Sequence, residues 1–79
     1  MENKKIEVFV RTYPACAYCD NLKTLLDSKG IIYSKKDIVD EDNYEEFASH
    51  RLRTVPAVFI DGVFFGGFTE MNDLLKEEK

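Results

Sequence analysis

Cys16 and Cys19 are the residues of this chain whose type and spacing most directly suggest chemistry. Two cysteines separated by two residues can form a structural disulfide, supply half of a metal site, or act as a redox pair. A structural zinc site takes four Cys or His ligands, and the chain adds only His50 to the two cysteines, so one copy cannot complete it. A disulfide that closes so short a loop adds little stability and does not persist in reducing cytosol. The redox interpretation is therefore favoured.

A thiol–disulfide exchange needs one thiolate that attacks and a second thiol that resolves the mixed disulfide. Apolar residues recur at helical spacing over residues 17–29, and Gly30 follows where a left-handed residue would end a helix. Cys16 is thus expected at the helix N-terminus, where unpaired N–H groups and the helix dipole favour the thiolate. Cys19 lies one turn further in and should remain a thiol. The spacing predicts that Cys16 attacks and Cys19 resolves.

The elements that must position this pair follow from apolar periodicity and turn residues. A strand, a helix and a second strand in succession form a βαβ unit, whose two strands are expected to be parallel. Asp61-Gly62 between two apolar runs predicts a hairpin with a type I′ turn. Tyr44, Phe47 and Ala48 are expected to form the apolar stripe of the second helix. The expected elements are strands over 6–10, 31–38, 57–60 and 63–65, and helices over 17–29, after Asp40 or Asp42, and after a capping Thr69.

Length and charge limit the classes of protein that the chain can represent. The 79 residues are expected to form one domain, residues 1–79. A net charge of −4 argues against a nucleic-acid binder, because phosphate contacts need a clustered basic face. No apolar run approaches the roughly 20 residues that cross a bilayer, and the first residues do not resemble a signal peptide. We expect no membrane association and a cytoplasmic location.

The order β-α-β-α-β-β-α, with three motifs at particular places, resembles a known family. Cys-Ala-Tyr-Cys at 16–19, Thr-Val-Pro at 54–56 and Gly-Gly at 66–67 together make the chain similar to the glutaredoxins of the thioredoxin-fold superfamily. It is most similar to the small dithiol glutaredoxins of T4-like bacteriophages. The resemblance implies an α/β thioredoxin-like fold, with a four-stranded mixed sheet in the order 2-1-3-4 and helices on both faces.

The resemblance also implies an activity and its partners. The chain would be a monomeric enzyme that uses glutathione to reduce protein disulfides and glutathione mixed disulfides, with no metal and no tightly bound cofactor. Ribonucleotide reductase would be one electron acceptor, in the host cytoplasm if a phage encodes the chain. Pro56 is expected to follow a cis peptide bond. The residues expected to contact glutathione are Arg11, Tyr18, Arg53, Thr54, Val55, Pro56, Gly67, Phe68 and Thr69.

Some residues depart from the family pattern and leave alternatives open. Ala17 replaces a usual proline, and Thr69 stands where an acidic residue is common. The basic residue for the glycyl carboxylate of glutathione is Arg11 if positions are counted along the strand, whereas Tyr13 occupies that place if they are counted back from Cys16. Arg53 is a second candidate for the same role. Two other functions remain: a redoxin reduced by thioredoxin reductase, and a carrier of a glutathione-ligated [2Fe–2S] cluster.

Overall fold

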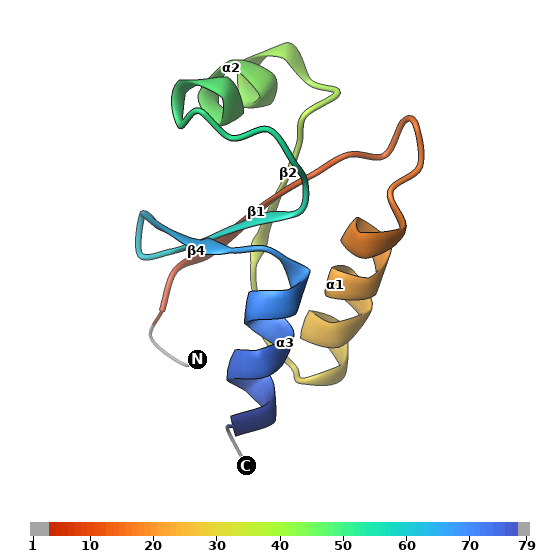
Figure 1. Cartoon of the computed structure of the whole chain (residues 1–79), viewed down its shortest axis with the longest axis vertical. Helices are drawn as coiled ribbons and strands as arrows, with labels where there is room; N and C mark the ends of the chain where they lie inside the picture. Colours follow the sequence, from red (N-terminus) through yellow and green to blue (C-terminus); the bar gives the residue numbers. More distant parts are fainter. Residues whose placement is uncertain (1–3, 78–79) are drawn as a thin grey trace.

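The computed structural model describes residues 4–77 as a four-stranded sheet with three helices. Strand β1 lies between β2, to which it is parallel, and β3, to which it is antiparallel, while β4 pairs with β3. The order β2-β1-β3-β4 confirms the predicted topology. Figure 1 shows α1 and α3 side by side and α2 apart from them. The elements are β1 (Ile6–Val10), α1 (Ala17–Ser28), β2 (Ser34–Asp37), α2 (Glu41–Ser49), β3 (Ala57–Ile60), β4 (Val63–Gly66) and α3 (Phe68–Glu77).

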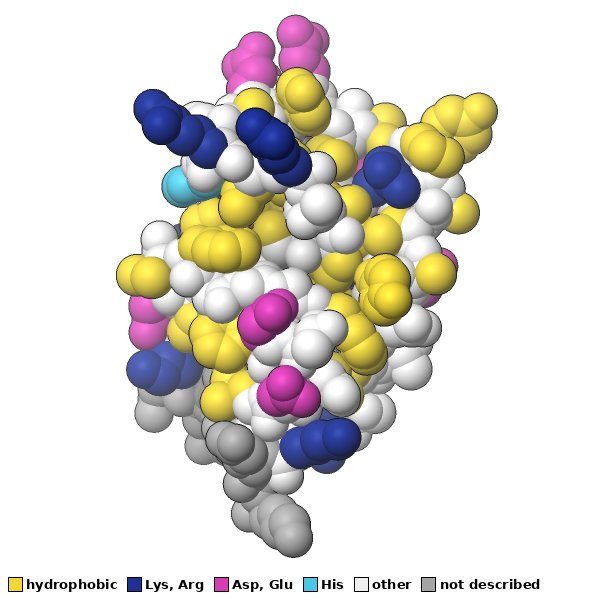
Figure 2. Space-filling view, in the orientation of Figure 1, with side chains coloured by type: hydrophobic (Ala, Val, Ile, Leu, Met, Phe, Trp, Pro, Cys, Tyr) yellow, Lys and Arg dark blue, Asp and Glu magenta, His cyan; other side chains and the backbone are white. Residues whose placement is uncertain are grey.

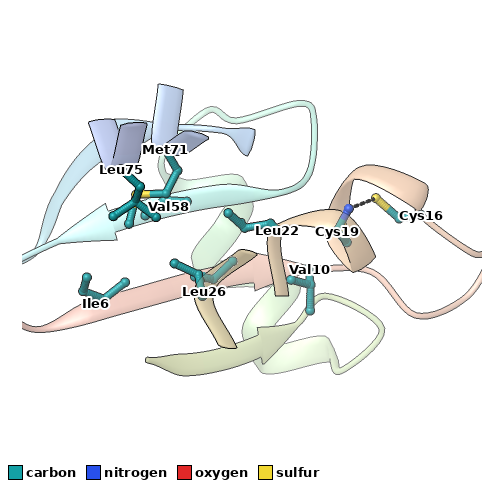
Figure 3. Close-up of a cluster of buried hydrophobic side chains, with 10 residues drawn as sticks. Ile6, Val10, Cys16, Cys19, Leu22, Leu26, Val58, Met71 and Leu75 are labelled. Carbon is teal, nitrogen blue, oxygen red and sulfur yellow. Dashed lines mark hydrogen bonds between the residues drawn. The ribbon is translucent and has the colours of Figure 1, made fainter. Parts of the chain in front are cut away.

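The side chains of β1 alternate between two hydrophobic cores. Ile6, Val8 and Val10 pack in one core, and Phe9 packs in the other. This follows from the period of two in a strand, and it explains why β1 is apolar on both faces. The first core joins the sheet to α1 and α3 and is drawn in Figure 3. Its other buried members are Cys16, Cys19, Leu22, Leu26, Val58, Met71 and Leu75, while Phe47, Ala57 and Phe59 complete the second core.

Helix α1 ends in a Schellman motif that also determines where β2 begins. Gly30 has a φ of 69°, its N–H donates to the Asp27 carbonyl, and the N–H of Ile31 donates to the Leu26 carbonyl. The backbone of Ile31 is therefore committed to closing the helix and does not pair with β1. The prediction that the strand starts at residue 31 is wrong: β2 covers Ser34–Asp37, and Ile32 is 91% exposed.

Asp40 caps α2, as one of the two predicted choices. Its Oδ1 accepts hydrogen bonds from the N–H groups of Asp42, at 2.9 Å, and Asn43, at 3.4 Å. Of the predicted apolar stripe only Phe47 is buried, and Tyr44 and Ala48 are exposed. The helix has nine residues and packs on the sheet mainly through the Phe47 ring. The prediction that Tyr44 and Ala48 share this buried face is wrong.

The hairpin forms as predicted, whereas the start of the last helix differs. Asp61 and Gly62 both have positive φ, 52° and 83°, as a type I′ turn requires. Helix α3 begins at Phe68, so Thr69 lies inside it and does not cap it. The carbonyl of Gly67 accepts the first helical hydrogen bond, from the N–H of Met71. Within residues 4–77 no helix is long and apolar enough to cross a membrane.

Candidate active site

Cys16 caps the N-terminus of α1 with its sulfur atom. Its backbone is extended, with φ −128° and ψ 107°, and its Sγ accepts a hydrogen bond from the N–H of Cys19 at 3.1 Å. This contact is the dashed line in Figure 3. An N-terminal helical N–H has no partner within the helix, and here a sulfur takes the place usually filled by a Ser or Asp oxygen. The same N–H stabilises a negative charge on Cys16.

Cys19 lies inside the first turn of α1 and is held as a thiol. Only 1% of its surface is exposed. Burial, followed by the hydrogen bond with Cys16, raises the pKa of Cys19 to about 12, although the backbone N–H of Arg11 acts in the opposite direction. Both cysteines are free thiols. Both sulfurs are buried, but they differ in place and in bonding: Cys16 lies at the helix end and accepts a hydrogen bond, whereas Cys19 is almost fully enclosed and its pKa is raised.

The loop before β3 lies beside Cys16. The carbonyl oxygen of Val55 is 4.0 Å from Cys16 Sγ, although the two residues are 39 positions apart. The Val55–Pro56 peptide bond is cis, as predicted, and Pro56 is buried. Val55 is half-buried and packs against both cores, which fixes its backbone relative to the sheet. Thr54 precedes it and is exposed.

The N-terminus of α3 forms a further wall of the site. The rings of Tyr18 and Phe68 are 6.1 Å apart, and this contact links the start of α1 to the start of α3. A Cβ added to Gly67 would lie 3.1 Å from the Pro56 carbonyl oxygen, so this glycine allows the proline loop and α3 to approach closely. Thr69 is exposed on the first turn of α3.

Glu70 is a residue of this site that the sequence analysis missed. Its Oε1 accepts a hydrogen bond of 2.7 Å from the N–H of Gly67, and this contact lowers the pKa of Glu70. Such a bond, from the residue before the helix to a glutamate three positions later, is one half of a capping box. The spacing Gly67-x-x-Glu70 before an apolar run was the available signal.

The predicted basic residues lie at the edge of the site. Arg11 is half-buried, and its Nε donates a hydrogen bond of 3.0 Å to the Pro14 carbonyl. The Tyr13–Pro14 bond is cis, which the sequence analysis did not predict, and Tyr13 is 81% exposed. Arg53 is exposed. Figure 2 shows hydrophobic side chains in a band between basic side chains over the α2–β3 connection and acidic side chains over α3.

Two thiols at the start of a helix, next to a cis-proline loop in a thioredoxin-like sheet, define a thiol–disulfide oxidoreductase. Residues 6–65 match the family model named Glutaredoxin. Glutaredoxin 1 of Rickettsia prowazekii is 35% identical over an alignment of 81 positions that covers 95% of this chain and 85% of the relative. The chain belongs to the glutaredoxin family.

Solved structures agree with this assignment. The crystal structure of glutaredoxin 1 from Francisella tularensis, complexed with cacodylate, is similar with a TM-score of 0.75 at 25% identity and covers 94% of each chain. The buckwheat glutaredoxin–glutathione complex has the same TM-score at 29% identity and covers 94% of this chain and 70% of its own. Among the described residues, no three or more His, Cys, Asp or Glu side chains are grouped so that they could hold a metal ion.

Proposed function

We propose that this chain is a dithiol glutaredoxin in which Cys16 attacks and Cys19 resolves. The observation that carries the assignment is the asymmetry of the two sulfurs: Cys16 Sγ accepts a helical N–H at 3.1 Å, while burial keeps Cys19 protonated. The Cys16 thiolate attacks a substrate disulfide, forms a mixed disulfide and releases one substrate thiolate. Cys19 then gives up its proton and attacks Cys16 Sγ, so the second substrate thiol leaves and a Cys16–Cys19 disulfide remains.

Two molecules of glutathione complete the cycle. The first attacks Cys16 and restores the Cys19 thiol, and the second attacks the resulting glutathione–Cys16 disulfide and leaves as glutathione disulfide. Glutathione as the reductant is supported by the similarity to buckwheat glutaredoxin, which was solved with this tripeptide. Protein disulfides, that of ribonucleotide reductase among them, are the proposed acceptors. We assign the activity to a monomer in the cytoplasm, where a reducing pool maintains thiols.

The proposed glutathione site runs from the loop before β3 to the start of α3. The Val55 backbone pairs with the extended tripeptide, whose cysteine then lies at Cys16. The N–H groups of Phe68 and Thr69 receive the γ-glutamyl carboxylate at the positive end of α3. The N–H of Gly67 already donates to Glu70 and is not a free donor for glutathione. Gly67 acts instead by having no side chain, which lets the start of α3 lie close to the Pro56 carbonyl.

Arg11 and Arg53 are both proposed for the glycyl carboxylate, and substitution distinguishes them. A charge-assisted contact contributes about 1.5–3 kcal/mol, so loss of the correct arginine should raise the KM for glutathione roughly tenfold while kcat changes less. Arg11→Gln and Arg53→Gln, each compared with its lysine variant, identify the residue. If neither substitution changes the KM, the carboxylate lies elsewhere.

A competition between reductants tests the proposed function. Reduction of insulin or of a glutathionylated peptide is measured with glutathione, glutathione reductase and NADPH, and separately with thioredoxin reductase and NADPH. Efficient turnover is expected in the first system. Turnover confined to the second system would make the chain a redoxin of the thioredoxin reductase pathway and would leave the roles of Cys16 and Cys19 unchanged.

A further inference from the structure

A pocket adjoins the loop before β3, whose Val55 carbonyl lies beside Cys16. Its volume is about 320 Å³. It adjoins the site through Pro56, which follows the residue whose carbonyl faces Cys16 Sγ. Its lining residues are Leu52, Thr54, Pro56, Ala57, Phe64, Phe65, Gly66, Gly67 and Glu70.

An irregularity in the hairpin gives this pocket its apolar wall. Phe59 pairs with Phe64, whereas Val58 pairs with Gly66, so Phe65 is an extra residue in β4. In a regular strand two successive side chains point to opposite faces. The bulge at Phe65 allows both phenylalanines to line one pocket, and both are exposed side chains.

Glu70 is the single charged residue in the pocket lining. Its position is fixed from two sides. Oε1 is bonded to the N–H of Gly67, and the stem of the side chain lies against Gly66, where an added Cβ would be 2.6 Å from Glu70 Cγ. The second carboxylate oxygen takes no part in the Gly67 bond. The pocket therefore combines apolar walls with one oriented negative charge.

We propose that this pocket binds the side chain of a lysine or arginine close in sequence to the reacting cysteine of a protein substrate. Such a side chain has an apolar stem that fits the phenylalanine wall and a cationic head that pairs with Glu70. An acidic side chain in the pocket is repelled by Glu70, whereas Phe68 and Thr69, proposed for the γ-glutamyl carboxylate, are not part of the pocket lining. Because extended residues advance about 3.3 Å each, a substrate cysteine at Cys16 brings residues a few positions away to the pocket. The proposal rests on the proposed function only in taking protein disulfides as substrates.

The test uses peptides with a single cysteine that carries a thionitrobenzoate group. The Cys16 thiolate bonds to the peptide sulfur, and the sulfur–sulfur bond to thionitrobenzoate breaks, releasing a yellow anion that is measured. In an alanine background, lysine is moved through the positions on each side of the cysteine, and norleucine replaces it in a matched set. At one position the lysine-to-norleucine ratio of rate constants should be roughly two- to fivefold, as expected for an exposed ion pair.

The decisive variant is Glu70→Gln, because glutamine can still accept the Gly67 N–H and only the charge is lost. The ratio should fall to about one in this variant and stay high in Asp73→Asn, which removes a charge of the same helix outside the pocket. Glu70→Lys should favour glutamate-containing peptides instead. The proposal would be overturned if the lysine-to-norleucine ratio were the same in the unsubstituted protein and in Glu70→Gln for every lysine position in the peptide. It would also be overturned if the ratio fell equally in Asp73→Asn. The assay contains no glutathione, so failure of glutathione coupling leaves its outcome unaffected.

Discussion

The N-termini of α1 and α3 meet the same physical need in two chemically different ways. Each helix begins with N–H groups that have no partner within the helix. At α1 the acceptor is the sulfur of Cys16, 3.1 Å from the N–H of Cys19, and at α3 it is a carboxylate oxygen of Glu70, 2.7 Å from the N–H of Gly67. In the proposed mechanism the first acceptor is the nucleophile and changes its bonding during the reaction, whereas the second remains a carboxylate throughout.

The two caps also differ in where they lie along the chain. Cys16 precedes its helix, so its sulfur lies at the end of the helix and faces the Val55 carbonyl. Glu70 reaches back from inside α3 and brings a negative charge to the positive end of that helix. A helix end can therefore hold a reactive group or compensate its own dipole, and this molecule uses one end for each.

Replacement of Cys16 should have the largest effect. Cys16→Ser removes the attacking sulfur but keeps an oxygen that can cap α1, so the fold should persist while all thiol–disulfide exchange falls to the uncatalysed rate. Circular dichroism and insulin reduction measure the two properties. Glu70→Ala, the matched change at the other cap, should lower insulin reduction by no more than about fivefold, because Glu70 does not react. If Cys16→Ser stayed active while Cys19→Ser was inactive, the two roles would be reversed.

Replacement of Cys19 should separate two activities. Cys19→Ser should lose most reduction of protein disulfides, because no second thiol resolves the mixed disulfide. Removal of glutathione from a glutathionylated peptide should continue, because free glutathione resolves that intermediate. Both rates are measured in the glutathione reductase system. Equal loss of both activities would mean that Cys19 acts in the attack step as well.

Gly66→Ala sharpens the comparison on the α3 side by disturbing the Glu70 cap. The new Cβ would lie 2.6 Å from Glu70 Cγ at a φ of 153°, so we expect a loss of about 2–3 kcal/mol in the free energy of unfolding. Gly62→Ala is the control, since its φ is also positive at 83° but no atom lies within 4 Å, and it should cost about 1 kcal/mol. Urea denaturation measures both. If the two variants lost the same free energy of unfolding, the close contact between Glu70 and position 66 would not be what makes Gly66 necessary.

The smallest expected effect is the pH dependence of the Glu70 cap. The Gly67 N–H lowers the pKa of Glu70 below its ordinary 4.5. A carboxyl group whose pKa is lower in the folded protein than in the unfolded chain stabilises the fold at pH values above the unfolded-state pKa. This stabilisation is lost as the pH falls through the folded-state pKa. The stability of the protein relative to Glu70→Gln should thus be constant near neutral pH and decrease below about pH 4.5. Denaturation across this range tests it, and a difference independent of pH would contradict the assigned cause.

The sequence predicted those features that depend on short-range pattern and spacing. Cys16 at the helix start, the Asp61-Gly62 turn and the sheet order were all confirmed. The first two follow from residues close in the chain, whereas the sheet order was implied by the resemblance to a family. The cis bond before Pro56 was also foreseen, but through resemblance to a family rather than through local physics.

Other features depend on choices between equivalent local signals. Thr69 and the Gly67–Glu70 pair both offered a cap for α3, and only the geometry of the β4–α3 junction decides between them. Ile31 has the composition of a strand residue, yet the closing hydrogen bond of α1 uses its N–H. The pocket was not predicted because it depends on a bulge that lets Phe64 and Phe65 line the same pocket.

The pairing of β1 with β3 has a consequence for synthesis of the protein. In the centre of the sheet, Ile6 is paired with Ile60, so the first strand must wait for most of the chain to leave the ribosome before its antiparallel partner exists. The Val55 carbonyl beside Cys16 also emerges late, 39 residues after the thiol. Closing such long-range contacts is the slow part of folding. A nascent chain therefore exposes both cysteines outside the ribosome before the loop that contains Val55 has formed beside them. An oxidant present during that interval reacts with thiols that do not yet have the surroundings of the folded protein.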